Sequence, residues 1–455
     1  MAAPAQPQQK KTLLMTEGSI WKSILLFSVP LILGNLLQQL YNTADSIIVG
    51  NFLGSNALAA VGSSGSPIYL LIGFSQGVAV GAGVVVSQYL GAKDKKETRI
   101  AVHTSLAIAV ILGLILTVGG IAVSRSLLVW MNTPEEVLGD AVTYMKLYFG
   151  GVLFSVVYNM AAGILNAAGN SRRSVIYLAC ASITNIILDL VLIAGLKMGV
   201  AGAAIATVIS QIASCVIGFA YMHRKYALLR FSLRELRLDV KTAGRILQVG
   251  APMAIQQSIV SCGFLFLQRL VNYYGESMIA SYTVATRMEN ILMIPILGVQ
   301  NTMATFAGQN MGAQRPDRVS RGLGQGVLVS LSMTLVLCLC QIFGISRIIR
   351  AFQLDEAAAA ICRLHLFSSA VAMPIFAVYF PANGMCQGVG EGFHATFFAL
   401  LALGLRVIFA YALHNTALFG YTAVWWSQAM AWTVTLLVCY AHVFRGKWKT
   451  KSLIS

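Results

Sequence analysis

Apolar residues run along this chain in long stretches that short polar clusters separate. Each stretch has about 20 residues or more, the length that an α-helix needs to cross the hydrocarbon of a bilayer. Several stretches exceed that length, so we expect tilted or bent helices. The pattern predicts twelve transmembrane helices, at about 22–48, 57–89, 100–123, 140–168, 175–195, 200–221, 246–272, 279–310, 323–344, 358–387, 395–413 and 421–444.

Composition supports a polytopic all-α membrane protein. Of the 455 residues, 57% are hydrophobic and 11% are charged, whereas an average soluble domain carries about 25% charged residues. Soluble enzymes, disordered tails and disulfide scaffolds are therefore excluded. The net charge of +16 lies mostly in the loops, not on one face with aromatic residues between the charges. We therefore expect the lipid bilayer as a partner and no nucleic acid.

The basic residues also predict the topology. Of the 32 Lys and Arg residues, 23 fall in the two tails and in alternate loops, whereas the other loops hold four. Because basic residues accumulate on the inner side of a membrane, we expect both termini in the cytoplasm.

The second half of the chain repeats the first. SILLFSVPLILGN matches RILQVGAPMAIQQ, which places Pro30 over Pro252, and glycines then recur at an offset of 221 residues. Six helices per half give both halves the same orientation, as in transporters with parallel repeats. We predict a tail at 1–19, an N-lobe at 20–222, a basic cytoplasmic linker at 223–245, a C-lobe at 246–444 and a tail at 445–455.

Three acidic residues lie well inside predicted spans: Asp45, Asp189 and Glu289. An ionised carboxylate at the centre of a membrane helix costs about 2.5–3.5 kcal/mol, so such residues usually mark a functional site. At about 1.5 Å per residue, Asp45 and Asp189 reach comparable depths in the outer half of the first lobe. We interpret them as one site.

Other polar residues converge on the same region. Asn185 shares a helix face with Asp189, Thr207 lies eight residues into the next helix, and Tyr144 enters its helix from the outer side. Structural roles stay open for each residue. Asp45 could face the outer interface, Asp189 could pair with Asn185 or with Lys146, Tyr144 could belong to an interfacial belt, and Thr207 could bond its own helix carbonyl.

Three segments carry a family resemblance. LYNTADSIIVGNFLGSNALAAVG, SITNIILDLVLI and GVAGAAIAT, with the proline in the first helix, make the chain resemble the multidrug and toxic compound extrusion (MATE) family. The resemblance implies twelve helices in two six-helix lobes around a V-shaped central cavity, and cation-coupled drug export by a bacterial inner-membrane protein. It also implies that the N-lobe cation or proton site comprises Asp45, Tyr144, Asn185, Asp189 and Thr207.

Two carboxylates in a pocket of low dielectric constant cannot both ionise cheaply, so we expect the pair to titrate as a coupled unit. The pair could hold a proton or exchange it for Na⁺. Our hypothesis is that loading this site bends or repacks the first helix near Pro30. Alternatively, Pro30 is simply tolerated in a buried helix.

The second lobe does not duplicate the acidic site. The repeat places Arg406 at the position of Asn185, Ala410 at that of Asp189 and Leu267 at that of Asp45. We predict that Glu289, Arg406 and Asn42 line a substrate cavity in which Glu289 attracts cationic drugs. Equally, Glu289 could neutralise Arg406 or Arg287.

No histidines occur at i,i+4 and no CxxC motif is present, so we expect no transition-metal site. Motifs of membrane-embedded enzymes are also missing from the sequence. We therefore predict a secondary transporter, not an enzyme, with H⁺ or Na⁺ as the coupling ion and no cofactor. It would act as a monomer and export amphipathic organic cations. The alternative is a flippase for a lipid-linked precursor.

Overall fold

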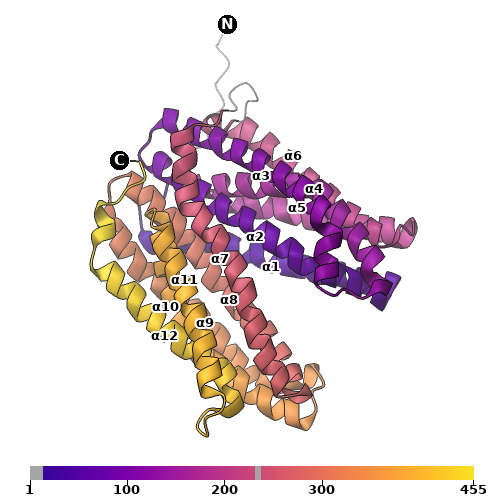
Figure 1. The fold of residues 1–455 in the computed structure, drawn as a ribbon. Helices are drawn as coiled ribbons and strands as arrows, with labels where there is room; N and C mark the ends of the chain where they lie inside the picture. Colours follow the sequence, from indigo (N-terminus) through magenta and orange to yellow (C-terminus); the bar gives the residue numbers. More distant parts are fainter. Residues whose placement is uncertain (1–13, 231–236, 455) are drawn as a thin grey trace. The chain divides into compact units, whose positions relative to one another are not determined.

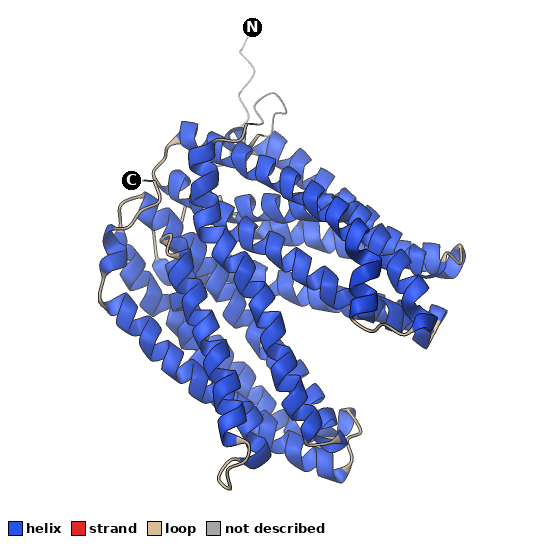
Figure 2. Cartoon of the chain, viewed as in Figure 1, coloured by secondary structure: helices blue, strands red, loops and turns tan. Residues whose placement is uncertain are grey.

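A computed structural model describes residues 14–230 and 237–454 of the chain. The described residues form helices joined by short loops, with no strand among them (Figure 2). The all-α prediction is confirmed. Most of the predicted N-terminal tail and six residues of the predicted linker, 231–236, lie outside the described residues.

The helices follow the predicted stretches, and most of them begin earlier and end later than predicted (Figure 1). Hydropathy falls at the first charged residue, whereas helical hydrogen bonding continues to the capping residue. The side chain of Asp94, for example, accepts hydrogen bonds from Lys96 N and Glu97 N and begins the third helix there. The helices are α1 (Ile20–Leu53), α2 (Ser55–Gly91), α3 (Lys95–Trp130), α4 (Glu135–Ala167), α5 (Ser171–Asp189), α6 (Gly199–Lys225), α7 (Val240–Tyr273), α8 (Glu276–Gly312), α9 (Pro316–Ala351), α10 (Glu356–Gly388), α11 (Gly392–Leu413) and α12 (Ala423–Phe444).

Eleven helical segments in the described part of the chain are long and apolar enough to cross a membrane. Helix α7 is not among these eleven, although it has 34 residues. The chain is therefore a multi-pass membrane protein by length and composition, and the count of twelve spans stays a prediction.

The chain packs as two compact units. We call Leu33–Ala251 the N-unit, and Met15–Ile32 together with Pro252–Ser455 the C-unit. Helices α1 and α7 each contribute residues to both units, and the change occurs beside Pro30 in α1 and at Pro252 in α7. The repeat-matched prolines thus mark equivalent points in the two halves. The predicted lobe boundaries, 20–222 and 246–444, did not anticipate that α1 and α7 contribute to both units, because hydropathy does not show which unit a helix packs in.

Backbone geometry confirms the repeat. Gly54 has φ 86° and ψ −175° before α2, and Gly275, 221 residues later, has φ 87° and ψ −174° before α8. Left-handed φ values recur at the same offset in Gly169 and Gly390, Gly199 and Gly420, Lys93 and Gln314, and Asn132 and Gln353. Such values suit glycine and are uncommon in other residues. Their recurrence means that corresponding turns have the same conformation.

Within each unit the two central helices approach closely at matched glycines. A Cβ atom on Gly163 of α4 would lie 3.0 Å from the carbonyl oxygen of Ala79 in α2. At the matched positions in the C-unit, a Cβ on Gly384 of α10 would lie closer still to the carbonyl oxygen of Gln300 in α8. Small residues let membrane helices approach to backbone contact, and these contacts fix the helices that carry the polar side chains described next.

Candidate functional site

The N-unit brings Asp45 of α1 and Asp189 of α5 together, within hydrogen-bonding reach of each other. Asp189 is fully buried, and Asp45 is half-buried. Because ionised carboxylates only accept hydrogen bonds, a bond between two carboxyl groups requires a proton on one of them. In each residue the Oδ1 atom is buried and accepts no hydrogen bond from an N–H or O–H group of the described residues. The pair can therefore hold a proton or offer oxygens to a hard cation.

Asn185 and Thr207 complete one side of this pair. The amide of Asn185 donates from Nδ2 to Asp189 Oδ2 at 2.9 Å and accepts from Thr207 N at 3.1 Å, in the orientation that gives both amide atoms complementary partners. The hydroxyl of Thr207 donates to the carbonyl oxygen of Ala203 at 3.0 Å. The helix-carbonyl bond anticipated for Thr207 is thus present, yet the side chain also lies in the acid cluster.

Tyrosines form the other side. Tyr144 is buried near Asp45, and its ring stacks on that of Tyr148 with the centroids 6.2 Å apart. Tyr41 is hydrogen-bonded to the side chain of Thr207, and Gln211 Nε2 donates to the Tyr148 hydroxyl at 3.4 Å. The site thus offers carboxyl, amide and hydroxyl oxygens together.

Sequence reasoning missed three of these residues, although their spacing could have found them. Tyr41 precedes Asp45 by four residues, Tyr148 follows Tyr144 by four, and Gln211 follows Thr207 by four. Residues four apart share a helix face. Hence Asp45, Tyr144 and Thr207 each indicated one of the missed residues on the same helix face.

The backbone changes directly after Asp189. Helix α5 gives way to a π-helix over Leu190–Gly195, in which Leu196 N bonds the carbonyl oxygen of Val191 at 2.8 Å. Single turns of π-helix occur frequently at functional sites because they alter the direction of the neighbouring side chains.

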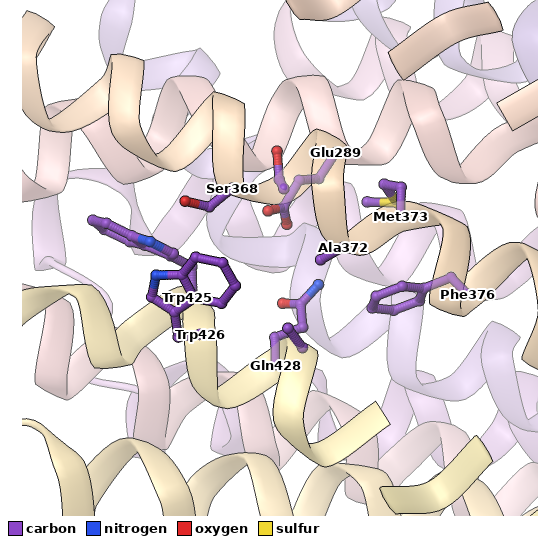
Figure 3. A pocket seen from close by; sticks show the side chains of 10 residues that line it. Glu289, Ser368, Ala372, Met373, Phe376, Trp425, Trp426 and Gln428 are labelled. Carbon is purple, nitrogen blue, oxygen red and sulfur yellow. The ribbon is translucent and has the colours of Figure 1, made fainter. Parts of the chain in front are cut away.

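The C-unit contains a pocket of different character, with Glu289 of α8 at its wall (Figure 3). Glu289 Oε1 lies 3.1 Å from Nε2 of the buried His365 in α10. The imidazole of His365 stacks on the ring of Trp425 with centroids 4.6 Å apart. The lining residues are Glu289, Ser368, Ser369, Ala372, Met373, Phe376, Trp425, Trp426, Gln428 and Ala429.

The remaining predicted residues are spread over the two units. Arg406 of α11 is 8% exposed and is hydrogen-bonded to Tyr282. Asn42 is exposed on α1, and Pro30 lies within the uninterrupted helix α1. The structure thus gives Glu289 a histidine partner that sequence reasoning did not consider, since it weighed only Arg406 and Arg287.

The two sites lie at repeat-matched places. At the offset of 221, Tyr144 corresponds to His365, and Thr207 corresponds to Gln428. The residues that replace the two aspartates, Leu267 and Ala410, are fully buried in one apolar cluster of the C-unit. The C-unit has therefore filled the place of the acid pair with apolar side chains and has brought its carboxylate from α8.

Comparisons with known proteins agree on one family. The MatE family model matches residues 30–191 and 252–412. The chain is 28% identical to the "Probable multidrug resistance protein YoeA" of Bacillus subtilis over 453 residues, 98% of this chain and 97% of the relative. It is 26% identical to the "Multidrug export protein MepA" of Staphylococcus saprophyticus over 430 residues, 94% of each chain.

Solved structures show the same fold. An outward-facing multidrug resistance MATE family transporter superposes with a TM-score of 0.90 at 26% identity, covering 98% of this chain and 100% of the other. A MOP superfamily transporter from Pyrococcus furiosus gives a TM-score of 0.90 at 25% identity, with the same coverage.

Proposed function

The chain belongs to the MatE family of multidrug efflux transporters, and from that premise we propose that it exports amphipathic organic cations in exchange for protons or Na⁺ bound at Asp45 and Asp189. The family transports and does not catalyse a covalent reaction, which agrees with the prediction of a non-enzyme. The single observation that carries the proposal is the buried contact between the two carboxyl groups.

A buried carboxyl pair couples well to a cation gradient. One bound proton reduces the negative charge of the pair, which lowers the free-energy cost of burying the pair in a medium of low dielectric constant. An incoming cation can replace that proton. Asn185 supports Asp189 through the 2.9 Å bond. Carboxyl, amide and hydroxyl oxygens also suit Na⁺, which prefers hard oxygen ligands. The site is therefore compatible with either coupling ion.

Helix α1 links this site to both units. Asp45 lies in the part of α1 that packs in the N-unit, whereas Ile20–Ile32 of the same helix packs in the C-unit. When Asp45 binds or releases a cation, α1 would straighten or bend near Pro30. The continuous backbone of α1 would transmit this movement along the helix. In this mechanism Pro30 acts as the hinge, because its ring removes one helix hydrogen bond.

The lining of the C-unit pocket has the chemistry to attract an organic cation. Glu289 supplies a negative charge, and Trp425, Trp426 and Phe376 supply apolar area and ring faces. Aromatic faces attract cations without strict demands on shape. We propose that Glu289 attracts the cationic group of the substrate. We also propose that the protein lies in the bacterial inner membrane, acts as a monomer and has both termini in the cytoplasm.

The test is transport in proteoliposomes with ethidium as the cationic cargo and with proton and Na⁺ gradients imposed separately. We expect at least one gradient to drive ethidium export, and Asp45→Asn or Asp189→Asn to abolish the driven component. Asp140→Asn is the matched control, since Asp140 is exposed on α4. Export by the wild type that neither gradient drives would refute the exchange mechanism, and driven export by both site variants at the wild-type rate would refute the site. Transport of a lipid-linked saccharide in place of ethidium would favour a flippase.

A further inference from the structure

Three side chains that commonly bind metals meet at one end of the C-unit. Glu391 follows α10, His394 lies in the first turn of α11, and His442 lies in the last turn of α12. One ligand atom from each residue can be chosen so that all three lie within 4.8 Å of one another. The two histidines are separated by 48 positions in the sequence, so ligand spacing along the chain gave no signal.

The geometry is that of a partly assembled site. Glu391 Oε2 lies 2.6 Å from His442 Nε2, and the imidazoles of His394 and His442 stack with centroids 4.4 Å apart. The carboxylate is 2% exposed and so is held in place, whereas both histidines are half-buried and accessible to an ion. Ligand atoms around a tetrahedral Zn²⁺ lie about 3.3 Å apart, given bonds of about 2.0–2.1 Å. Small side-chain rotations would therefore open the present hydrogen bond to that spacing.

Two imidazole nitrogens with one carboxylate oxygen favour Zn²⁺ and similar ions over Mg²⁺ or Ca²⁺, which prefer ligand sets made only of oxygens. We propose that Glu391, His394 and His442 bind a divalent transition metal, with Zn²⁺ the best match, and that Lys451 competes with the metal for Glu391. This site belongs to the C-unit, whereas Asp45 and Asp189 belong to the N-unit, and it does not depend on the proposed transport mechanism.

The competition follows from the other carboxylate oxygen. Lys451 Nζ lies 2.8 Å from Glu391 Oε1, and its side chain is 54% exposed. A divalent cation beside Glu391 would repel this ammonium group, which can move into solvent at little cost. Trp448, three residues before Lys451, is 1% exposed and donates from Nε1 to the carbonyl oxygen of Val443 at 3.0 Å. Metal binding would therefore release Lys451 while Trp448 keeps the chain end attached.

The test is direct metal titration of the full chain, purified with a tag that contains no histidine and stripped with a chelator. Zn²⁺ binding is measured by competition with a chromophoric chelator, and Co²⁺ absorption reports the coordination geometry. We expect one Zn²⁺ per chain, with affinity at least tenfold weaker in His394→Ala and in His442→Ala. His223→Ala is the matched control, because His223 is exposed on α6. Lys451→Ala should bind Zn²⁺ more tightly than the wild type.

The Lys451 variant separates this proposal from a purely ionic role of the cluster, since loss of a structural ion pair would not raise metal affinity. Folding of every variant is checked by its elution in size-exclusion chromatography. Three results would overturn the proposal: no Zn²⁺ binding by the folded wild type, binding that neither histidine substitution weakens, or weaker binding by Lys451→Ala.

Discussion

The N-unit and the C-unit share a backbone but differ in what they bury at matched positions. In the N-unit, Asp45 and Asp189 meet beside Asn185. In the C-unit, Leu267 and Ala410 occupy the matched places inside an apolar cluster. The chain thus contains an internal control, because one framework carries an acid pair in one unit and an apolar core in the other.

The difference teaches that the framework does not decide the chemistry. The turns, the glycine contacts and the lengths of the first four helices recur in both halves, whereas a few side chains decide whether a unit can hold a cation between two carboxyl groups. The C-unit pocket contains the carboxylate of Glu289, which is paired with His365. A single carboxylate beside aromatic rings suits attraction of a cationic substrate, whereas two carboxyl groups in contact suit storage of a proton.

The largest expected effect is the difference in gradient-driven export between variants of the two carboxylate sites. Asp189→Asn should reduce gradient-driven export about a hundredfold, which corresponds to loss of about 3 kcal/mol of coupling. Glu289→Gln should weaken substrate binding yet leave the dependence on the gradient intact. Ethidium export at several substrate concentrations, with and without a gradient, measures both quantities. Equal loss of gradient dependence in both variants would break the comparison.

The next effect concerns stability at the matched positions. Leu267→Asp places an unpaired carboxylate in an apolar cluster and should lower the free energy of unfolding by about 3–5 kcal/mol. Asp45→Leu should cost less, because Asp45 is half-buried, the variant relieves the contact between two carboxyl groups, and Asp189 keeps its bond from Asn185. Thermal unfolding of the detergent-purified variants checks both. Destabilisation of similar size in the two variants would contradict the account.

A smaller effect tests the shared framework. Gly384→Ala should destabilise by about 1–3 kcal/mol, because its methyl group would meet the backbone oxygen of Gln300. Gly163→Ala should cost less, since the matched contact with Ala79 is 3.0 Å and requires a smaller shift. Thermal unfolding again provides the measurement, and the reverse order would show that the two helix pairs do not correspond as described.

The smallest effect concerns the N-terminal ends of α1 and α7, the two helices that contribute residues to both units. Asp239 caps α7 by accepting from Thr242 N at 2.8 Å, and hydrogen bonds from the Thr242 side chain and backbone hold the pKa of Asp239 below its usual range. Asp239→Ala should cost about 1 kcal/mol. Because the pKa is lowered in the folded state, the stabilisation is present above about pH 4 and is lost as the pH falls through the folded-state pKa.

The segment before α1 is held differently, by Arg318, which donates to the carbonyl oxygens of Met15, Glu17 and Gly18. Arg318→Ala should destabilise slightly more than Asp239→Ala, since Arg318 bonds three carbonyl oxygens whereas Asp239 caps one helix end. Unfolding midpoints of the two variants at neutral pH decide the order, and a larger loss for Asp239→Ala would contradict it.

Much of the fold could be predicted because transmembrane helices have a recognisable sequence pattern. Long apolar stretches, the glycine register and the matched prolines located the helices and the repeat. The acid cluster was also accessible, since Asp45 and Asp189 are costly in a bilayer unless they have a role. Helical spacing of four residues then links Tyr41 to Asp45.

Other features depend on tertiary contacts that no local pattern encodes. The exchange of α1 and α7 between units follows from packing, and hydropathy cannot detect packing. His365 lies 76 residues from Glu289, so their pairing required the structure. The cluster of Glu391, His394 and His442 escaped detection for the same reason.

The most direct test of the central claim, that the N-unit carboxyl pair holds the coupling cation, is the number of protons released when a cationic substrate binds. Calorimetric titration with ethidium in Na⁺-free buffers of different ionisation enthalpy gives this number. The account predicts proton release by the wild type and by Glu289→Gln, and none by Asp189→Asn. Undiminished release by Asp189→Asn, or its loss in Glu289→Gln alone, would contradict the account.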